Sequence, residues 1–141
     1  MNNNTNIKKI ILSKIKKIKH YSIQNDLSVS EQIDNIAGIL NQNCDMLILS
    51  GYTAQSDMFL NIAKQTRQLC SIFNVTFIIE DRCDIAKIVD SDGIFLSKNN
   101  YSVEDCLIIT DKDKLIGTYN SDNLLKSQYD FILSQDKILT E

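Results

Sequence analysis

The stretch that decides the fold runs from residue 75 to residue 96 and reads VTFIIEDRCDIAKIVDSDGIFL. Residues 75–79 are β-branched and aromatic, which is typical of a buried strand. Residues 84–89 are predicted to form a short helix, and residues 93–96 are predicted to form a second strand. A strand, a helix and a strand in succession are typical of neighbouring parallel strands, so this stretch predicts an α/β fold.

The same alternation extends in both directions from this stretch. Further strands are predicted at residues 19–24, 46–49, 115–119 and 129–133. Further helices are predicted at residues 28–40, 56–73, 102–109 and 121–127. Ser28 is expected to begin the first of these helices, because Ser28 and Glu31 form a capping-box signature. Six strands with helices between them predict a parallel sheet in a single domain.

The strands are spaced like the turns of a (βα) barrel. A full eight-stranded barrel takes about 200 residues or more, and this chain has 141 residues. We therefore predict an incomplete TIM-type (βα) barrel of about six parallel strands, with an open, doubly wound sheet as the alternative. An incomplete barrel leaves two strand edges unpaired. The leading helix, the C-terminal tail or a second copy of the chain is expected to cover these edges, and the last possibility predicts a homodimer.

Charge divides the chain into two parts. The net charge of −3 argues against a dedicated nucleic-acid-binding protein. Residues 1–25 contain six lysines and no acidic residue. Isoleucines at helical spacing predict a basic amphipathic helix over residues 1–18, ahead of a (βα) domain over residues 19–141. This helix is expected to lie on its own domain, and binding to a membrane surface is the alternative.

The cysteines and the hydropathy pattern bound the class of protein further. The chain has one histidine, His20, and four scattered cysteines without a CxxC pair, so a structural zinc site is not expected. Buried free thiols are expected instead. No run of about 18 apolar residues is present that would span a membrane, and lysines interrupt the apolar residues near the start, which argues against a signal peptide. A cytoplasmic location is therefore expected.

Residues 74–96 resemble the thiamine phosphate synthase family and its TenI-type relatives. The family pattern is a strand followed by I-N-D-R-x-D-x-A and then by x-A-D-G-V-H-L-G-Q-x-D, and the chain has Ile79-Glu80-Asp81-Arg82 followed by Asp92-Gly93. Asp92-Gly93 is expected to form a tight turn into the next strand. Weaker matches are residues 45–50 with D-x-V-Q-L-R-x-K, residues 115–119 with I-I-G-V-S-T, and residues 129–132 with A-D-Y-I-G. The resemblance implies a TIM-type fold that lacks the last two strands of the family.

The resemblance also implies a transferase of thiamine biosynthesis. The family joins a hydroxymethylpyrimidine diphosphate to a thiazole phosphate and releases pyrophosphate, and Mg²⁺ and cationic side chains hold the phosphate charge. By this resemblance, Asp81 and Asn100 fall on the two metal-binding positions. The positions expected to bind the small-molecule phosphates are Ser50, Glu80, Lys98 and Tyr119.

Several of these positions depart from the family pattern. Asn100 replaces the second metal-binding aspartate, and Glu80 replaces the asparagine beside the first. Ser50 and Tyr52 replace the arginine and lysine of Q-L-R-x-K. Each charge-assisted contact to a buried phosphate that is lost costs about 1.5–3 kcal/mol. The resemblance thus implies thiamine phosphate synthase activity that these changes impair. The alternative is a noncatalytic member that binds a thiamine-related phosphate or a protein partner.

Overall fold

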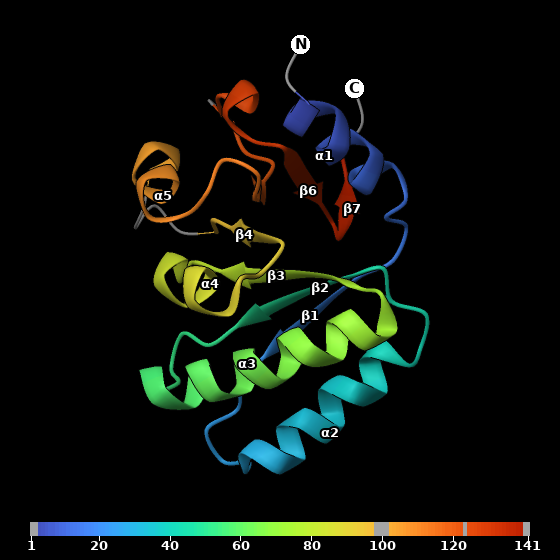
Figure 1. The fold of residues 1–141 in the computed structure, drawn as a ribbon, viewed down its shortest axis with the longest axis vertical. Helices are drawn as coiled ribbons and strands as arrows, with labels where there is room; N and C mark the ends of the chain where they lie inside the picture. Colours follow the sequence, from blue (N-terminus) through green and yellow to red (C-terminus); the bar gives the residue numbers. More distant parts are fainter. Residues whose placement is uncertain (1–2, 98–101, 123, 140–141) are drawn as a thin grey trace.

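The strands lie side by side in one sheet in the same order as they occur in the chain (Figure 1). The computed structural model describes residues 3–97, 102–122 and 124–139. Within these residues the sheet has seven strands: β1 (Ile18–Ser22), β2 (Met46–Ser50), β3 (Thr76–Glu80), β4 (Gly93–Phe95), β5 (Leu115–Tyr119), β6 (Phe131–Ser134) and β7 (Lys137–Ile138). Strands β1 to β6 are parallel, which confirms the six predicted strands, and β7 is antiparallel to β6. The sheet curls into a half-barrel, so the fold is the predicted incomplete barrel.

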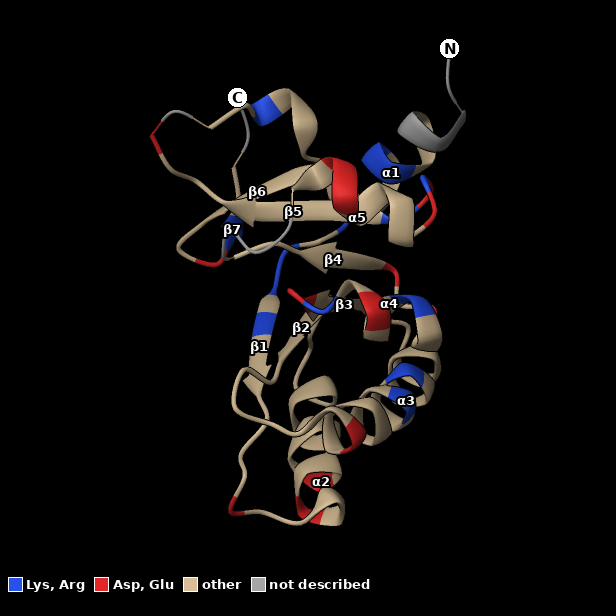
Figure 2. Cartoon of the chain, turned by 90° about the vertical axis from the view of Figure 1, so that its left-hand side faces the viewer, with Lys and Arg blue, Asp and Glu red and all other residues tan. Residues whose placement is uncertain are grey.

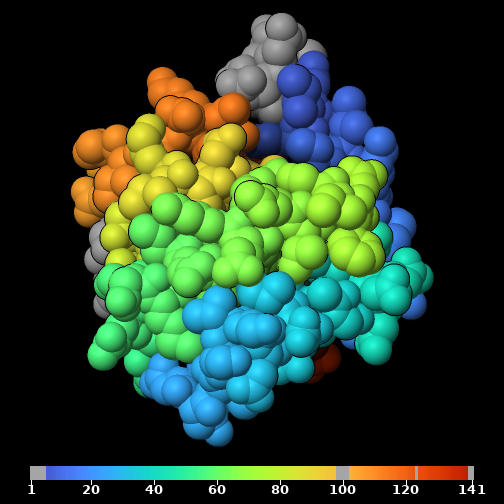
Figure 3. Space-filling model, turned by 60° about the horizontal axis from the view of Figure 1, so that its bottom comes forward, coloured from blue at the N-terminus to red at the C-terminus, as the bar shows by residue number. Residues whose placement is uncertain are grey.

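The helices that connect the strands cover the outer face of this sheet. They are α2 (Val29–Leu40), α3 (Ser56–Phe73), α4 (Cys83–Val89) and α5 (Val103–Ile109). The predicted capping box is present at the start of α2, where Ser28 Oγ accepts the Glu31 N–H at 3.1 Å and the Glu31 carboxylate accepts the Ser28 N–H at 3.2 Å. Figure 3 shows α2 and α3 packed side by side, with α4 next to them.

Alternation along each strand produces two hydrophobic clusters. Leu47, Leu49 and Phe77 point to the outer face, where they pack with the buried residues of α2 to α5. Met46 and Ile78 point to the inner face, in a separate cluster that includes residues of β4, β5 and β6. Because strands buried on both faces read as continuous apolar runs, β2 reads MLIL up to its final serine.

The basic leading helix covers the inner face. This helix, α1 (Asn3–Ser13), packs Ile11 and Leu12 against the inner cluster, as expected for a helix that lies on its own domain. Its lysines are visible in Figure 2, and Lys8 Nζ lies 3.0 Å from Asp130 Oδ2. The helix ends at Ser13, and Ile18 already begins β1. No helix in the described ranges is long and apolar enough to cross a membrane.

The chain turns back on itself after β6, which the sequence did not predict. Gln135 and Asp136 have φ values of 51° and 61°, and they form the tight turn that leads into β7. Two consecutive residues with positive φ are typical of the turn that joins antiparallel strands. Strand β7 therefore covers the free edge of β6. Asp136 Oδ1 also lies 2.9 Å from His20 Nε2 in β1, so the turn contacts the first strand of the curled sheet.

One predicted helix is wrong in its extent. Among the described residues of the 121–127 segment and just beyond it, the helical part is a 3₁₀ turn at Lys126–Gln128. Leu125 is 64% exposed, and none of the described residues in 121–127 is buried, so packing does not stabilise a longer helix there. The four cysteines are all free and buried, as predicted.

Candidate active site at the strand ends

The candidate site lies where β2, β3 and β4 end. Carboxyl ends of parallel strands meet at one edge of a sheet, and this edge carries the chemistry in (βα) barrels. Side chains alternate along a strand, so Ser50, Glu80 and Tyr119 continue the inner-face positions of Ile48, Ile78 and Gly117. Each of the three polar residues therefore ends a strand on the inner side of the sheet.

Four side chains form one hydrogen-bonded group at this edge, which we call the Tyr52 cluster: Tyr52, Glu80, Asp81 and Ser97. The Tyr52 hydroxyl is within hydrogen-bonding distance of the Glu80 carboxylate and of Ser97 Oγ, and it lies 2.7 Å from Asp81 Oδ2. Ser97 Oγ lies 2.9 Å from Glu80 Oε2 and 2.7 Å from Asp81 Oδ2. Two carboxylates thus share two hydroxyl donors.

The backbone of Asp81 directs its side chain toward β4. Asp81 has a φ of 62°, in the left-handed region that aspartate tolerates better than most residues. Its N–H donates to the Phe95 carbonyl at 2.9 Å, and its Oδ1 accepts the Ser97 N–H at 2.9 Å. The residue is 5% exposed. Strand β3 therefore ends abruptly at Asp81, and the carboxylate is fixed across the gap to the next strand.

Tyr52 acts as a hydrogen-bond donor in this arrangement. Burial raises the pKa of its phenol above the ordinary value of 10.0, and the hydrogen bond to Glu80 raises this pKa further. The hydroxyl therefore keeps its proton at neutral pH and donates a hydrogen bond to a carboxylate. The tyrosine ring itself is half exposed, so the cluster lies at the surface of the strand-end edge.

Arg82 directly follows the cluster residue Asp81 in the sequence, but its side chain pairs with Asp84. Arg82 Nη2 lies 2.9 Å from Asp84 Oδ2, and this arginine holds the pKa of the Asp84 carboxyl below its ordinary value through a side-chain hydrogen bond. The Arg82 guanidinium also lies 5.8 Å from the centre of the Phe59 ring. This arginine therefore takes part in the start of α4.

The other predicted site residues lie on neighbouring strand ends. Ser50 is buried, and its Oγ lies 3.0 Å from Ser22 Oγ at the end of β1. Tyr119 is 42% exposed and meets the Phe95 ring edge-on, with 4.7 Å between the ring centres. Lys98 and Asn100 lie outside the described residues. The structure thus brings Glu80 and Asp81 together, while Ser50 pairs with β1 and Tyr119 packs on β4.

Sequence reasoning missed the contribution of Tyr52 and Ser97. Tyr52 stands where the family pattern has a lysine, and Ser97 stands where it has the glycine of L-G-Q. Both replacements introduce a hydroxyl, and Glu80 introduces a carboxylate beside them. These three changes together could have predicted the cluster, because two hydroxyl donors and a carboxylate acceptor can hydrogen-bond to one another.

The donor atoms of the cluster suit a hard cation. Mg²⁺ is commonly held by one or two carboxylates together with substrate phosphates, and Glu80 and Asp81 present two carboxylates at one point. The described part of the chain contains no group of three or more histidine, cysteine, aspartate or glutamate side chains placed to hold a metal. Glu80 and Asp81 are thus two acidic oxygen donors at this edge and not a complete set of protein ligands.

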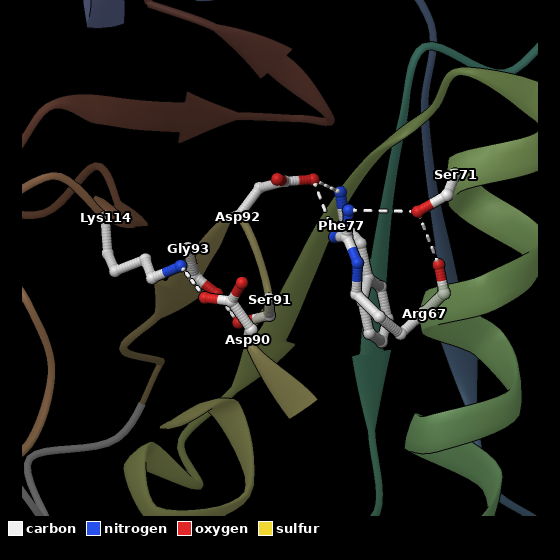
Figure 4. Close-up of polar contacts among 8 residues, drawn as sticks. All are labelled: Arg67, Ser71, Phe77, Asp90, Ser91, Asp92, Gly93 and Lys114. Atoms are coloured by element: carbon white, nitrogen blue, oxygen red, sulfur yellow. Dashed lines mark hydrogen bonds and ion pairs between the residues drawn. The ribbon is translucent and has the colours of Figure 1, made fainter. Parts of the chain in front are cut away.

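The Asp92-Gly93 pair has a structural role, at the opposite ends of the same strands (Figure 4). Asp92 Oδ2 accepts the Phe77 N–H at 2.7 Å and lies 3.0 Å from Arg67 Nη1. A Cβ added to Gly93 would lie 2.4 Å from the Leu115 carbonyl oxygen. This pair thus joins β3, β4 and β5 at their amino ends, as the predicted tight turn requires.

Comparisons with known proteins identify the family of this chain. A family model described as thiamine monophosphate synthase matches residues 21–129. The chain belongs to this family. The thiamine-phosphate synthase of Flavobacterium psychrophilum is 28% identical over 90 residues, which are 64% of this chain and 44% of that protein. The thiamine-phosphate synthase of Nostoc punctiforme is 31% identical over 85 residues, which are 60% of this chain and 24% of that protein.

A solved structure shows the same fold for the family. The thiamine phosphate pyrophosphorylase from Pyrococcus furiosus superimposes with a TM-score of 0.64 and 21% sequence identity. The match covers 74% of this chain and 50% of that one. This thiamine monophosphate synthase family member thus spans half or less of the length of these relatives.

Proposed function

We propose that this chain is a thiamine phosphate synthase that joins a hydroxymethylpyrimidine diphosphate to a thiazole phosphate and releases pyrophosphate. Family membership supports the reaction class. The observation that carries the proposal is the position of Asp81, which is buried at the end of β3 with its carboxylate fixed toward β4. This is the position of a metal-binding aspartate in the family pattern.

The roles of the side chains follow from their chemistry. Asp81 and Glu80 would hold Mg²⁺, which when bound neutralises the charge of the diphosphate leaving group. Tyr52 and Ser97 orient the two carboxylates by donating hydrogen bonds to them. Tyr52 is a neutral donor where the family pattern has lysine. Because a neutral donor supplies no positive charge to balance the developing charge of the diphosphate leaving group, we expect turnover well below that of a relative with the full pattern.

A second candidate function is noncatalytic binding of a thiamine-related phosphate or of a protein partner. The positions of the family arginine and lysine favour it, because Ser50 pairs with Ser22 and Tyr52 contacts both carboxylates. These two positions carry no positive charge to hold a pyrophosphate. Without these two cations the site stabilises an anionic leaving group poorly, which argues against turnover.

Turnover tests the first function. Thiamine phosphate formed from both substrates is measured with Mg²⁺ and with a chelator, for the wild type, Asp81→Asn and Asp84→Asn. We expect product that requires Mg²⁺, is lost in Asp81→Asn and is retained in Asp84→Asn. Asp84 is the matched control, because it carries the same carboxylate three residues away but pairs with Arg82.

Absence of product at high protein concentration would contradict the enzyme and leave the second function. That function is then tested by thermal unfolding with thiamine phosphate, the thiazole phosphate and pyrophosphate. A higher unfolding temperature with one of them that is lost in Asp81→Asn supports ligand binding at this site. No change with any of them would contradict it and leave a protein partner.

A further inference from the structure

Two of the four cysteines face each other in the outer core. Cys83 is the first residue of α4 and Cys106 lies in α5, and their Sγ atoms are 3.2 Å apart. Both residues are fully buried, at 0% exposure. The other two thiols are engaged elsewhere: Cys44 Sγ donates to the Met46 carbonyl, and Cys70 is buried in α3. The chain thus contains one preformed thiol pair between two helices that are adjacent in space.

We propose that Cys83 and Cys106 form a reversible disulfide when the protein meets a peroxide. A disulfide bond is about 2.05 Å long, so the two sulfur atoms need to approach by a little more than 1 Å from their separation of 3.2 Å. The helices α4 and α5 have seven residues each. A small oxidant reaches these buried thiols only when α4 or α5 opens locally, so we expect the reaction to be slow.

The chemistry balances with hydrogen peroxide as the oxidant. One cysteine sulfur attacks an oxygen of the peroxide, the O–O bond breaks, and a sulfenic acid and one water form. The sulfur of the second cysteine then attacks the sulfenic sulfur, which forms the S–S bond and releases a second water. The two thiols lose two electrons and two protons in total, and one peroxide is reduced to two waters. A dithiol reverses the step by exchange.

The two cysteines lie close in the chain to residues of the strand-end site, so disulfide formation would affect that site. Cys83 follows Asp81 by two residues, and Cys106 belongs to the helix after β4, the strand that ends just before Ser97. Asp81 and Ser97 are hydrogen-bonded to each other through both backbone and side chain. A bond between Cys83 and Cys106 therefore ties together two of the three connections that carry the Tyr52 cluster, those after β3 and after β4.

Peptide mapping of the native protein tests the proposal directly. Cleavage after lysine and arginine places the four cysteines in four different peptides: residues 20–64, 68–82, 83–87 and 99–112. The folded wild-type protein is treated with hydrogen peroxide and then unfolded in denaturant, its remaining thiols are alkylated, and it is digested without reductant. We expect peptides 83–87 and 99–112 to be linked, with a mass about 2 Da below their sum, and to separate after dithiothreitol. Peptides 20–64 and 68–82 should carry the alkylating label.

Matched variants and a stability measurement decide between a native and an accidental link. Cys70→Ser should still form the link, and Cys106→Ser should not. A cross-link that fits the native fold raises the thermal unfolding midpoint of the oxidised wild type, because it restricts the unfolded chain. The proposal is overturned if peroxide leaves both thiols open to alkylation in the unfolded digest. It is also overturned if Cys83 pairs with another cysteine, or if the link lowers the midpoint.

Discussion

At the residue scale, the Tyr52 cluster shows how a replaced side chain can acquire a new partner. The family lysine and asparagine are replaced by Tyr52 and Glu80, and the two new groups hydrogen-bond to each other. The resemblance to the family predicted Asp81 as a metal-binding position and Glu80 as a phosphate-binding position, because both fall within the family pattern after the strand at residues 75–79. It did not reveal the reach of Tyr52 across the strand ends, because which strand-end side chains meet depends on register and on the backbone of Asp81.

Tyr52→Phe is expected to lower the free energy of unfolding by about 1 kcal/mol at pH 8, because one hydrogen bond to a buried carboxylate is lost. The pKa of Tyr52 is raised in the folded protein above 10.0. Its contribution is therefore fully present below pH 10 and is lost as the pH rises further. The difference between wild type and Tyr52→Phe in urea unfolding should shrink between about pH 10 and pH 11. A difference that stays constant or grows over this range would contradict the assignment.

Two glycines make a matched pair with opposite expected effects. A Cβ on Gly93 would lie 2.4 Å from the Leu115 carbonyl oxygen, and a Cβ on Gly38 in α2 would meet nothing within 4 Å. Gly93→Ala should destabilise the protein by about 1–3 kcal/mol through forced strand displacement. Gly38→Ala should stabilise it by about 0.5–1 kcal/mol, because alanine favours the helix. Urea unfolding of both variants checks this, and a destabilising Gly38→Ala or a neutral Gly93→Ala would count against the packing described.

At the scale of elements, the bounds of helices were predicted correctly where a sequence pattern extends over several residues. Helix α3 has the predicted bounds, because its apolar residues recur over five turns, and α2 begins where its capping box predicts. Strand β7 was missed because two residues carry no periodicity and its turn, Gln135-Asp136, lacks the usual Asn-Gly signal. The predicted 121–127 helix was wrong in extent because its apolar residues are two adjacent leucines, Leu124 and Leu125, which have no helical periodicity.

The capping box of α2 supplies a test of how much a helix start contributes. Ser28→Ala removes the acceptor for the Glu31 N–H and should lower the free energy of unfolding by about 0.5–2 kcal/mol. Ser30 lies two residues further on, exposed on the same helix, and Ser30→Ala should change stability by less than about 0.5 kcal/mol. Equal effects of the two substitutions in chemical denaturation would show that the cap contributes nothing specific.

At the scale of the whole molecule, the half-barrel leaves β1 at the edge of the sheet. Strand β7 pairs with the outer edge of β6, and α1 packs on the inner face of the sheet. The C-terminal segment therefore covers one of the two strand edges that were predicted to need a partner. Ile7 and Ile10 of α1 remain more than half exposed. We expect a second copy of the chain to cover the remaining edge, so light scattering should give twice the mass of one chain. A mass of 16.1 kDa at every protein concentration would contradict the homodimer.

The order of the strands also bears on how the molecule assembles during synthesis. Every strand pairs with the one made just before it, so each new pairing closes only a short loop, which favours rapid folding. A ribosome releases the amino end first, and the sheet can therefore grow strand by strand as the chain emerges. Helix α1 is the exception, because Lys8 meets Asp130 across 122 residues. The first helix to be synthesised is thus among the last elements to dock, and until then its isoleucines are available to chaperones.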